Sequence, residues 1–265
     1  MFTTLAFVTA LSLAPAQAQL ALTNDQVTYG YLGAARPDTK FLPGDIFFLT
    51  FDIENVKVND NGEVLYSMGM EVRDSNGKQV FAQKPQDKKA VNTLGGTRLP
   101  AFAHVFCGSD QLPGEYTVRV AVTDRVSKQE KTIERKFEVL KPDFGLVQVG
   151  LSIDSDMQMP APAVGVAGQF VYVNFAAVGF ERDKAKKQPN VAAEMRVLDD
   201  SGQPVLSKPF TGEAAGNVGN DKLVPMQFLL ALNRTGKFQV ELKATDRISK
   251  KTAKVVFPIT VVASK

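Results

Sequence analysis

The hexapeptide Thr123-Asp124-Arg125-Val126-Ser127-Lys128 recurs further along the chain as Thr245-Asp246-Arg247-Ile248-Ser249-Lys250. The residues before it repeat as well, because Gly114-x-Tyr116-x-Val118-x-Val120-x-Val122 matches Gly236-x-Phe238-x-Val240-x-Leu242-x-Ala244. In both copies apolar residues occupy alternate positions, as in an antiparallel strand with one face buried and the other in water. The sequence therefore predicts two copies of one β-module, each with the hexapeptide as a hairpin turn.

Earlier parts of the two copies repeat more loosely, and together they predict seven strands per copy. The predicted strands are 26–33, 45–54, 64–73, 78–82, 100–107, 115–123 and 131–140, followed by 145–153, 169–178, 191–198, 203–207, 223–232, 237–245 and 252–262. No segment sustains the periodicity of an amphipathic helix. Short strands with regular turn signals predict an all-β protein built from sandwiches of two antiparallel sheets, with an up-and-down barrel as the alternative.

The stretch Leu112-Pro113-Gly114-Glu115-Tyr116-Thr117-Val118 resembles the tyrosine corner of immunoglobulin-like domains. With the Thr-Asp-Arg turn and the Phe137-x-Val139 ending, the chain is similar to the tandem Ig-like modules of exported bacterial proteins, which include fibronectin type III-like and macroglobulin-like repeats. The resemblance implies two tandem seven-stranded Ig-like antiparallel β-sandwiches. It departs from antibody domains in lacking the core tryptophan and the disulfide cysteines, and Phe238 replaces the corner tyrosine in the second copy. Such motifs specify a fold and no activity.

The N-terminal residues predict an export signal. Residues 1–18 carry no charge, contain the apolar run 5–13, and end in Ala16-Gln17-Ala18, a pattern typical of signal peptide cleavage. An uncleaved anchor is the alternative. We expect a signal peptide over 1–18, a first module over 19–141 and a second over 142–265, with the boundary at Lys141-Pro142-Asp143. No later stretch has the length of a membrane span, so the mature chain is expected in the periplasm, at the cell surface or outside the cell.

Composition argues against several classes of function. The formal net charge is only +3 and tryptophan is absent, which does not favour binding of nucleic acid. With one histidine, His104, and one cysteine, Cys107, the usual nucleophilic triads and His or Cys metal clusters are excluded. Both residues are expected in strands, Cys107 as a small buried apolar side chain and His104 half buried. We therefore predict no catalytic residue, no cofactor and no metal; the alternative for a metal is calcium at Asp154 and Asp156.

Duplication of Asp124 and Asp246 favours a structural role in the turn, since an active site need exist only once. Loops that emerge at one pole of a sandwich are common binding sites, and the first module should present such loops at its free pole. The predicted partner-binding residues there are Asn59, Asp60, Asn61, Lys88, Lys89, Asp124, Arg125 and Lys128. The sequence thus predicts a non-enzymatic exported binding or structural protein that acts on a cell-envelope or extracellular protein or polysaccharide. The alternative is an exported hydrolase, or its accessory domain, with a carboxylate pair in one cleft.

Overall fold

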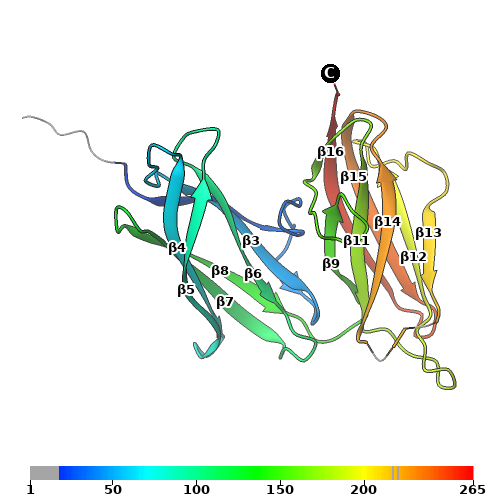
Figure 1. The fold of residues 1–265 in the computed structure, drawn as a ribbon. Helices are drawn as coiled ribbons and strands as arrows, with labels where there is room; N and C mark the ends of the chain where they lie inside the picture. Colours follow the sequence, from blue (N-terminus) through cyan, green and yellow to red (C-terminus); the bar gives the residue numbers. More distant parts are fainter. Residues whose placement is uncertain (1–17, 217, 220, 265) are drawn as a thin grey trace, which may run out of the picture.

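A computed structural model describes residues 18–264 except 217 and 220, and within these residues it contains strands and no α-helix (Figure 1). Most of the predicted signal peptide, residues 1–17, lies outside the described residues. The strands are β1 (Ala21–Thr28), β2 (Lys40–Phe41), β3 (Ile46–Glu54), β4 (Glu63–Asp74), β5 (Gln79–Val91), β6 (Leu99–Phe106), β7 (Gly114–Asp124), β8 (Glu130–Val139), β9 (Gly145–Ser152), β10 (Val164–Val166), β11 (Phe170–Val178), β12 (Val191–Leu198), β13 (Phe210–Ala214), β14 (Leu223–Ala231), β15 (Gly236–Asp246) and β16 (Thr252–Val262). The described part of the chain holds no helix long and apolar enough to cross a membrane.

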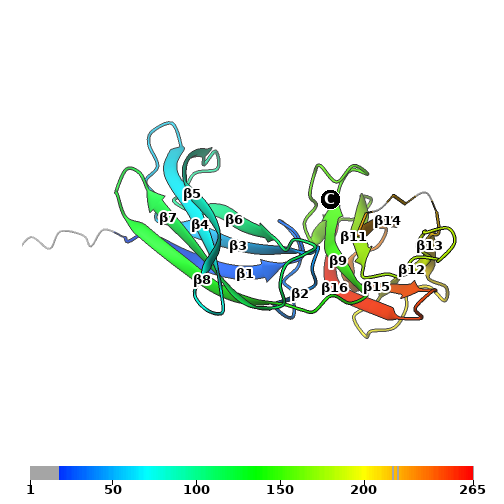
Figure 2. The same ribbon diagram turned by 90° about the horizontal axis from the view of Figure 1, so that it is seen from below.

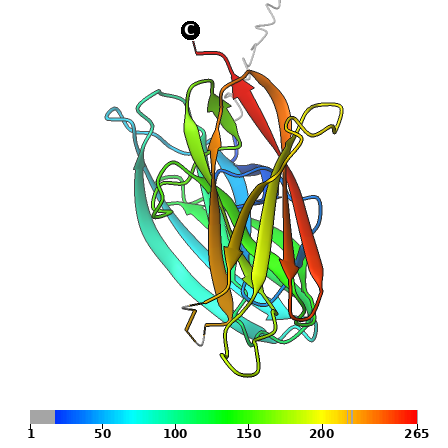
Figure 3. The same ribbon diagram turned by 90° about the vertical axis from the view of Figure 1, so that its right-hand side faces the viewer.

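The strands form four sheets, two in each half of the chain. Module 1 (β1 to β8) pairs a three-stranded sheet of order β1-β3-β6 with a five-stranded sheet of order β2-β8-β7-β4-β5. Module 2 (β9 to β16) repeats this arrangement as β9-β11-β14 and β10-β16-β15-β12-β13. In Figure 1 the modules lie next to each other, joined by the short segment after β8, and Figure 3 looks onto module 2. The predicted all-β class and layered sheets are confirmed.

Each module has eight strands, whereas the sequence pattern predicts seven. The additional strands are β2 and β10, which pair in parallel with the last strand of their module, β8 and β16. They have only 2 and 3 residues, too few for an alternating pattern to be recognised. Figure 2 shows β2 beside the end of β8 nearest module 2.

Three strands differ in position from the prediction. β1 ends at Thr28, because the chain turns at Gly30 with a φ of 77°. β5 continues to Val91 through a bulge near Pro85, so that Lys88 and Lys89 lie in a strand and not in a loop. In module 2 the predicted strand 203–207 is replaced by β13 at 210–214, and Pro204 makes only an isolated bridge. Proline has no N–H with which to continue a ladder.

Local features of the repeated segment have the predicted roles. The Tyr116 hydroxyl donates a hydrogen bond of 2.7 Å to the Leu112 carbonyl, which completes a tyrosine corner in module 1. Phe238 cannot make this bond and packs against the core of module 2. Asp124 and Asp246 are 1% and 0% exposed, and each carboxylate accepts backbone N–H groups of its own turn. The prediction that these aspartates shape the turns is confirmed.

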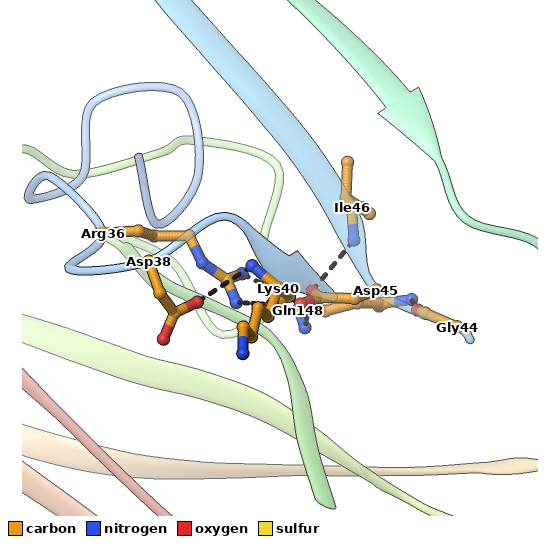
Figure 4. Close-up of polar contacts among 7 residues, drawn as sticks. All are labelled: Arg36, Asp38, Lys40, Gly44, Asp45, Ile46 and Gln148. Carbon is orange, nitrogen blue, oxygen red and sulfur yellow. Dashed lines mark hydrogen bonds and ion pairs between the residues drawn. The ribbon is translucent and has the colours of Figure 1, made fainter. Parts of the chain in front are cut away.

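A buried polar cluster joins the two modules (Figure 4). Oδ1 of Asp45 accepts N–H groups from Ile46 in module 1 and from Gln148 in module 2, at 2.9 and 2.8 Å. The Gln148 side chain donates to the Gly44 carbonyl at 2.8 Å, and Arg36 donates to Oδ2 of Asp45 at 2.9 Å. Gln148 has a φ of 53° and lies where the β9 to β11 register shifts, so a bulge turns its N–H toward module 1.

The loop after β1 adds an apolar contact to this junction. Tyr29 belongs to the buried core cluster of module 2, with its ring centroid 5.8 Å from that of Phe257. The Leu32 carbonyl of the same loop accepts a hydrogen bond from the Ala163 N–H of module 2. The loop, drawn in dark blue between the modules in Figure 1, therefore ties module 1 to both the core and the backbone of module 2.

Cys107 is buried as predicted, at 2% exposure, and its thiol has a pKa raised from 9.0 to about 12 by burial and then by the Asp45 carboxylate. At a pH of about 8 this leaves roughly a thousandth of the thiolate of a free cysteine. We therefore expect alkylation by iodoacetamide to be about a thousandfold slower in the native protein than in urea, measured by mass spectrometry. Native alkylation within tenfold of the rate in urea would contradict this burial.

Candidate binding cleft

A hollow of about 690 Å³, named here the cleft, runs along one open side of module 1. Its walls are β4 and β5 of the five-stranded sheet and β6 of the three-stranded sheet, and its floor includes Tyr116 and Phe137. β5 and β6 are the outermost strands of their sheets, so no strand bridges the two layers here. The volume is within the range of ordinary ligand sites.

Two alanines keep this side open. Ala101 and Ala103 are opposite the core residues Phe51 and Leu49 in the β3 to β6 register. The matching core residues of module 2 are Phe175 and Val173, which are opposite Met226 and Phe228 of β14. Phe228 stacks on Phe175 with ring centroids 5.8 Å apart. Where module 1 has two methyl groups, module 2 thus has two large side chains.

The larger side chains close the corresponding side of module 2. A Cβ placed on Gly212 of β13 would lie 3.6 Å from the Phe228 ring and 4.0 Å from the end of Met226, so these side chains reach from β14 to β13. The remaining space on this side is about 290 Å³ and lies beside the segment 205–210. An open cleft is therefore a property of module 1 and not of the repeat.

The two edge strands that border the cleft, β5 and β6, differ in polarity. β6, Leu-Pro-Ala-Phe-Ala-His-Val-Phe, carries no Asp, Glu, Lys or Arg. β5 carries Lys84, Lys88 and Lys89 together with Pro85, which are the residue types that protect a free edge from pairing with another strand. Lys88 is paired with Tyr66 of β4, and both line the cleft. The β5 edge is thus protected along its length, whereas β6 carries only Pro100, near its start, of these residue types.

Aromatic side chains extend the β6 wall onto the outer face of its sheet. Phe102 packs against Tyr31, with ring centroids 4.1 Å apart, and stacks with His104 at 6.0 Å; the His104 ring lies 5.6 Å from that of Phe48. Phe106, two residues further, is 54% exposed. His104 is exposed and not half buried as predicted, since it alternates with the inward Ala103 and Val105.

The cleft is apolar with an excess of positive charge. Among the described residues, Lys88 is the only lining residue of fixed charge, and no Asp or Glu lines the walls. Lys88 forms no ion pair with the described residues. Burial, and then the nearby Tyr31, raise the pKa of Tyr66, so that its hydroxyl stays neutral. A ligand with an apolar body and one anionic group matches this lining.

The eight residues predicted from sequence gather near the end of module 1 where β4 begins. Loops 55–62, 92–98 and 125–129 meet there through hydrogen bonds such as Val56 N–H to the Thr97 carbonyl and Lys57 N–H to Asp124. Asn59, Asp60 and Asn61 are exposed in the first loop, and Lys128 is exposed in the third. Lys89 is paired with Glu63, and Arg125 with Asp87 at 3.0 Å. Asp124 is buried, and only Lys88 lines the cleft.

Glycoside hydrolysis uses a carboxyl group with a raised pKa as its acid. Every carboxyl group with a shifted pKa in the described residues is shifted downward. In Asp124 burial alone would raise the pKa, but the N–H groups of Lys57, Val126 and Ser127 outweigh it. Glu71 and Glu134, which share a shallow surface hollow, are both paired with Arg119.

In the described chain no three Asp, Glu, His or Cys side chains gather in a possible metal site. Asp154 binds N–H groups of its own turn.

Sequence reasoning missed Ala101 and Ala103, although a signal was present. When the segments 99–106 and 223–231 are aligned through the strands that each pairs with, β3 and β11, two alanines of module 1 correspond to a methionine and a phenylalanine of module 2. Such a change in side-chain volume between repeats is visible only when the register of this loosely repeated strand is known.

No known family model matches this chain, and no curated protein matches it. Solved structures with partial similarity include the C-terminal domain of the antigen I/II-family protein AspA of Streptococcus pyogenes, with 8% identity over 92% of this chain and 100% of that chain and a TM-score of 0.31. The C-terminal domain of the AgI/II polypeptide BspA of Streptococcus agalactiae has 8% identity over 89% and 99% and a TM-score of 0.29. Red sea bream transglutaminase has 12% identity over 93% of this chain, a TM-score of 0.28, and only 32% of its own length covered. Similarities at this level carry no functional conclusion.

Proposed function

We propose that this chain is an exported, non-catalytic binding protein whose ligand site is the cleft of module 1. The observation that supports it is the contrast between the repeats, with Ala101 and Ala103 where module 2 has Met226 and Phe228. Filling this side would stabilise a purely structural module, because buried methylene groups contribute roughly 0.8 kcal/mol each. An open apolar cleft kept at that cost is expected where a ligand completes the core.

The loops of the free pole remain a second predicted contact surface, for a cell-envelope or extracellular protein or polysaccharide. Both surfaces are expected to contact the same partner, since Lys88 of the cleft and Lys89 are neighbours in β5, and Lys89 is paired with Glu63, which begins β4 directly after the loop 55–62. Export over residues 1–18 and the division into modules at 141 and 142 belong to this proposal. The rival hydrolase is less well supported, because Glu71 and Glu134, two carboxylates that share one hollow, are both paired with Arg119.

Filling the cleft tests the proposal directly. The double variant Ala101→Met with Ala103→Phe copies the residues of module 2, so it is expected to fold and to abolish ligand binding. The probe is the anionic apolar dye anilinonaphthalene sulfonate, titrated by fluorescence. We expect saturable binding to the native protein and at least about tenfold weaker binding to the filled variant, one factor of ten being about 1.4 kcal/mol.

The control for this experiment is Leu94→Ala, which removes an apolar side chain that is fully exposed outside the cleft. It should leave the dye affinity unchanged, while circular dichroism and the unfolding temperature verify that all variants are folded. Equal dye affinity of the native protein and a folded Ala101→Met/Ala103→Phe variant would rule out the cleft as the ligand site.

A further inference from the structure

We infer that the occupant of the cleft is an extended polypeptide segment that adds to module 1 as a strand beside β6. This inference rests on the proposed function and specifies its ligand. The segment would have apolar side chains at alternate positions and a carboxylate near one end. It would convert the sheet β1-β3-β6 into a four-stranded sheet and place a new set of side chains between the two layers.

The backbone of β6 provides the first argument. Among the strands of the described residues, β6 is the last in its sheet and pairs with β3 alone, over all 8 residues from Leu99 to Phe106. Alternate N–H and C=O groups of an edge strand point away from the sheet and are free to pair with an added strand. Natural edge strands usually carry charged side chains, especially lysine, or proline to prevent this. β6 has no residue of fixed charge, and its one proline is Pro100, near its start.

The side chains of β6 provide the second argument, because they suit both faces of an added strand. Inward, Ala101 and Ala103 leave room for every second side chain of the segment above Tyr116 and Phe137. Outward, Phe102, His104 and Phe106 form a row beside which the remaining side chains would lie. Cross-strand pairs of aromatic and β-branched residues stabilise such a face by about 0.2–1 kcal/mol each.

Charge provides the third argument and selects the partner. On β5, across the cleft, Lys88 faces inward, and Lys84 lies on the same strand outside the cleft lining. A second copy of this chain joined through β6 would bring two such lysine-bearing strands together, which disfavours self-association. A segment with an acidic residue would instead pair with Lys88, so the expected partner is a different protein.

Three blocked peptides of the length of β6, 8 residues, test this inference. In the parent peptide, valine and phenylalanine alternate with threonine, and a glutamate replaces one terminal residue. The other two carry backbone N-methyl groups on either the odd or the even residues. Successive N–H groups of a strand point to opposite edges, so methylation blocks the edge toward β6 in only one of these two peptides. Binding is measured by calorimetry on the full chain.

We expect the parent and one methylated peptide to bind, and the other methylated peptide to bind at least about tenfold more weakly. Lys88→Glu should weaken the parent by a similar factor, whereas Lys84→Glu, outside the cleft lining, should not. If the dye binds in the cleft but both methylated peptides bind as well as the parent, side chains alone hold the ligand, and strand addition is wrong while the proposed function stands. If the parent peptide does not bind although the dye does, strand addition is again wrong and the proposed function stands. That result favours an anionic lipid as the ligand of the cleft. If neither probe responds to filling the cleft, the proposed function itself fails.

Discussion

Replacing Asp45 by alanine is expected to lower the free energy of unfolding by about 3–5 kcal/mol, the usual effect of removing one partner of a buried ion pair. The change leaves Arg36, whose side chain is 13% exposed, without its anion. It also removes the acceptor of the N–H groups of Ile46 and Gln148. Because Gln148 belongs to module 2, the variant should also loosen the contact between the modules.

Two measurements separate these effects. Differential scanning calorimetry should show a single cooperative transition of the native protein replaced by two transitions in Asp45→Ala, because each module then unfolds by itself. Small-angle X-ray scattering should show a larger maximum dimension for the variant, since the modules can move apart. A native-like transition temperature and scattering profile for Asp45→Ala would show that the buried cluster does not hold the junction.

The matched control is Asp110→Ala, which removes the acidic partner of an exposed ion pair between the modules. Lys222 and Asp110 lie 2.6 Å apart, but their side chains are 63% and 86% exposed. Exposed pairs are screened by water and salt, so this variant should be indistinguishable from the native protein in both measurements. The comparison isolates the effect of burial.

Asp124→Ala and Asp246→Ala are each expected to cost about 3 kcal/mol, because each leaves buried backbone N–H groups without an acceptor. Asp124 accepts N–H groups of Lys57, Val126 and Ser127, at 2.9, 2.8 and 3.2 Å. Asp246 accepts the equivalent bonds from Glu181 and Ile248, at 2.9 and 3.0 Å. The two variants should lose equal amounts of stability, because the equivalent bonds recur in the two modules, and calorimetry of both variants measures this.

The stability due to these aspartates should depend on pH. Burial would raise the pKa of both carboxyl groups, but hydrogen bonds to their ionised forms lower it below 3.8. A group with a lowered pKa in the folded state stabilises the protein above the unfolded pKa and loses this contribution as the pH falls through the folded value. The difference between native protein and Asp124→Ala in urea unfolding should therefore be constant from about pH 5 to 7 and shrink below about pH 4.

Asp60→Ala is the control for these turn variants. Asp60 is an exposed aspartate of the neighbouring loop. Its replacement should change neither the unfolding midpoint nor its dependence on pH. A difference between native protein and Asp124→Ala that stays the same at all pH values would contradict a role for the ionised carboxylate.

Most strands could be predicted because the information is local. Alternation along 115–123 and 237–245 depends only on which side of each strand faces the core, and the structure has β7 and β15 at these positions. The repeated Asp124 and Asp246 similarly specify their turns through bonds to residues two and three positions later. Positions were predicted less well where pairing partners decide the strand. β13 is the example, since nothing in 203–207 reveals that pairing passes to 210–214.

The predicted binding residues illustrate a different limit. Loops at one pole of a sandwich converge, which is the basis for predicting Asn59, Asp60, Asn61, Lys89, Arg125 and Lys128 as binding residues. In the structure, hydrogen bonds join these loops, such as the bond from the Lys57 N–H to Asp124. Whether they bind a partner remains a prediction. The cleft could not be predicted in this way, because it is lined by strand residues whose inward or outward direction has to be known.

The repeated hexapeptide and the alternating strands were sufficient to determine that this protein consists of all-β modules in duplicate, because both are consequences of short-range geometry. Tertiary structure alone decided that the copies differ in shape, with an open cleft in module 1 and a smaller hollow on the corresponding side of module 2. Ala101 and Ala103 matter only because they face Phe51 and Leu49 across a register set by long-range pairing. Asp45 likewise joins the modules only because the bulge at Gln148, 103 residues away, turns an N–H toward it. Contacts between distant residues, and the free volume that they leave, arise only when the sheets pack.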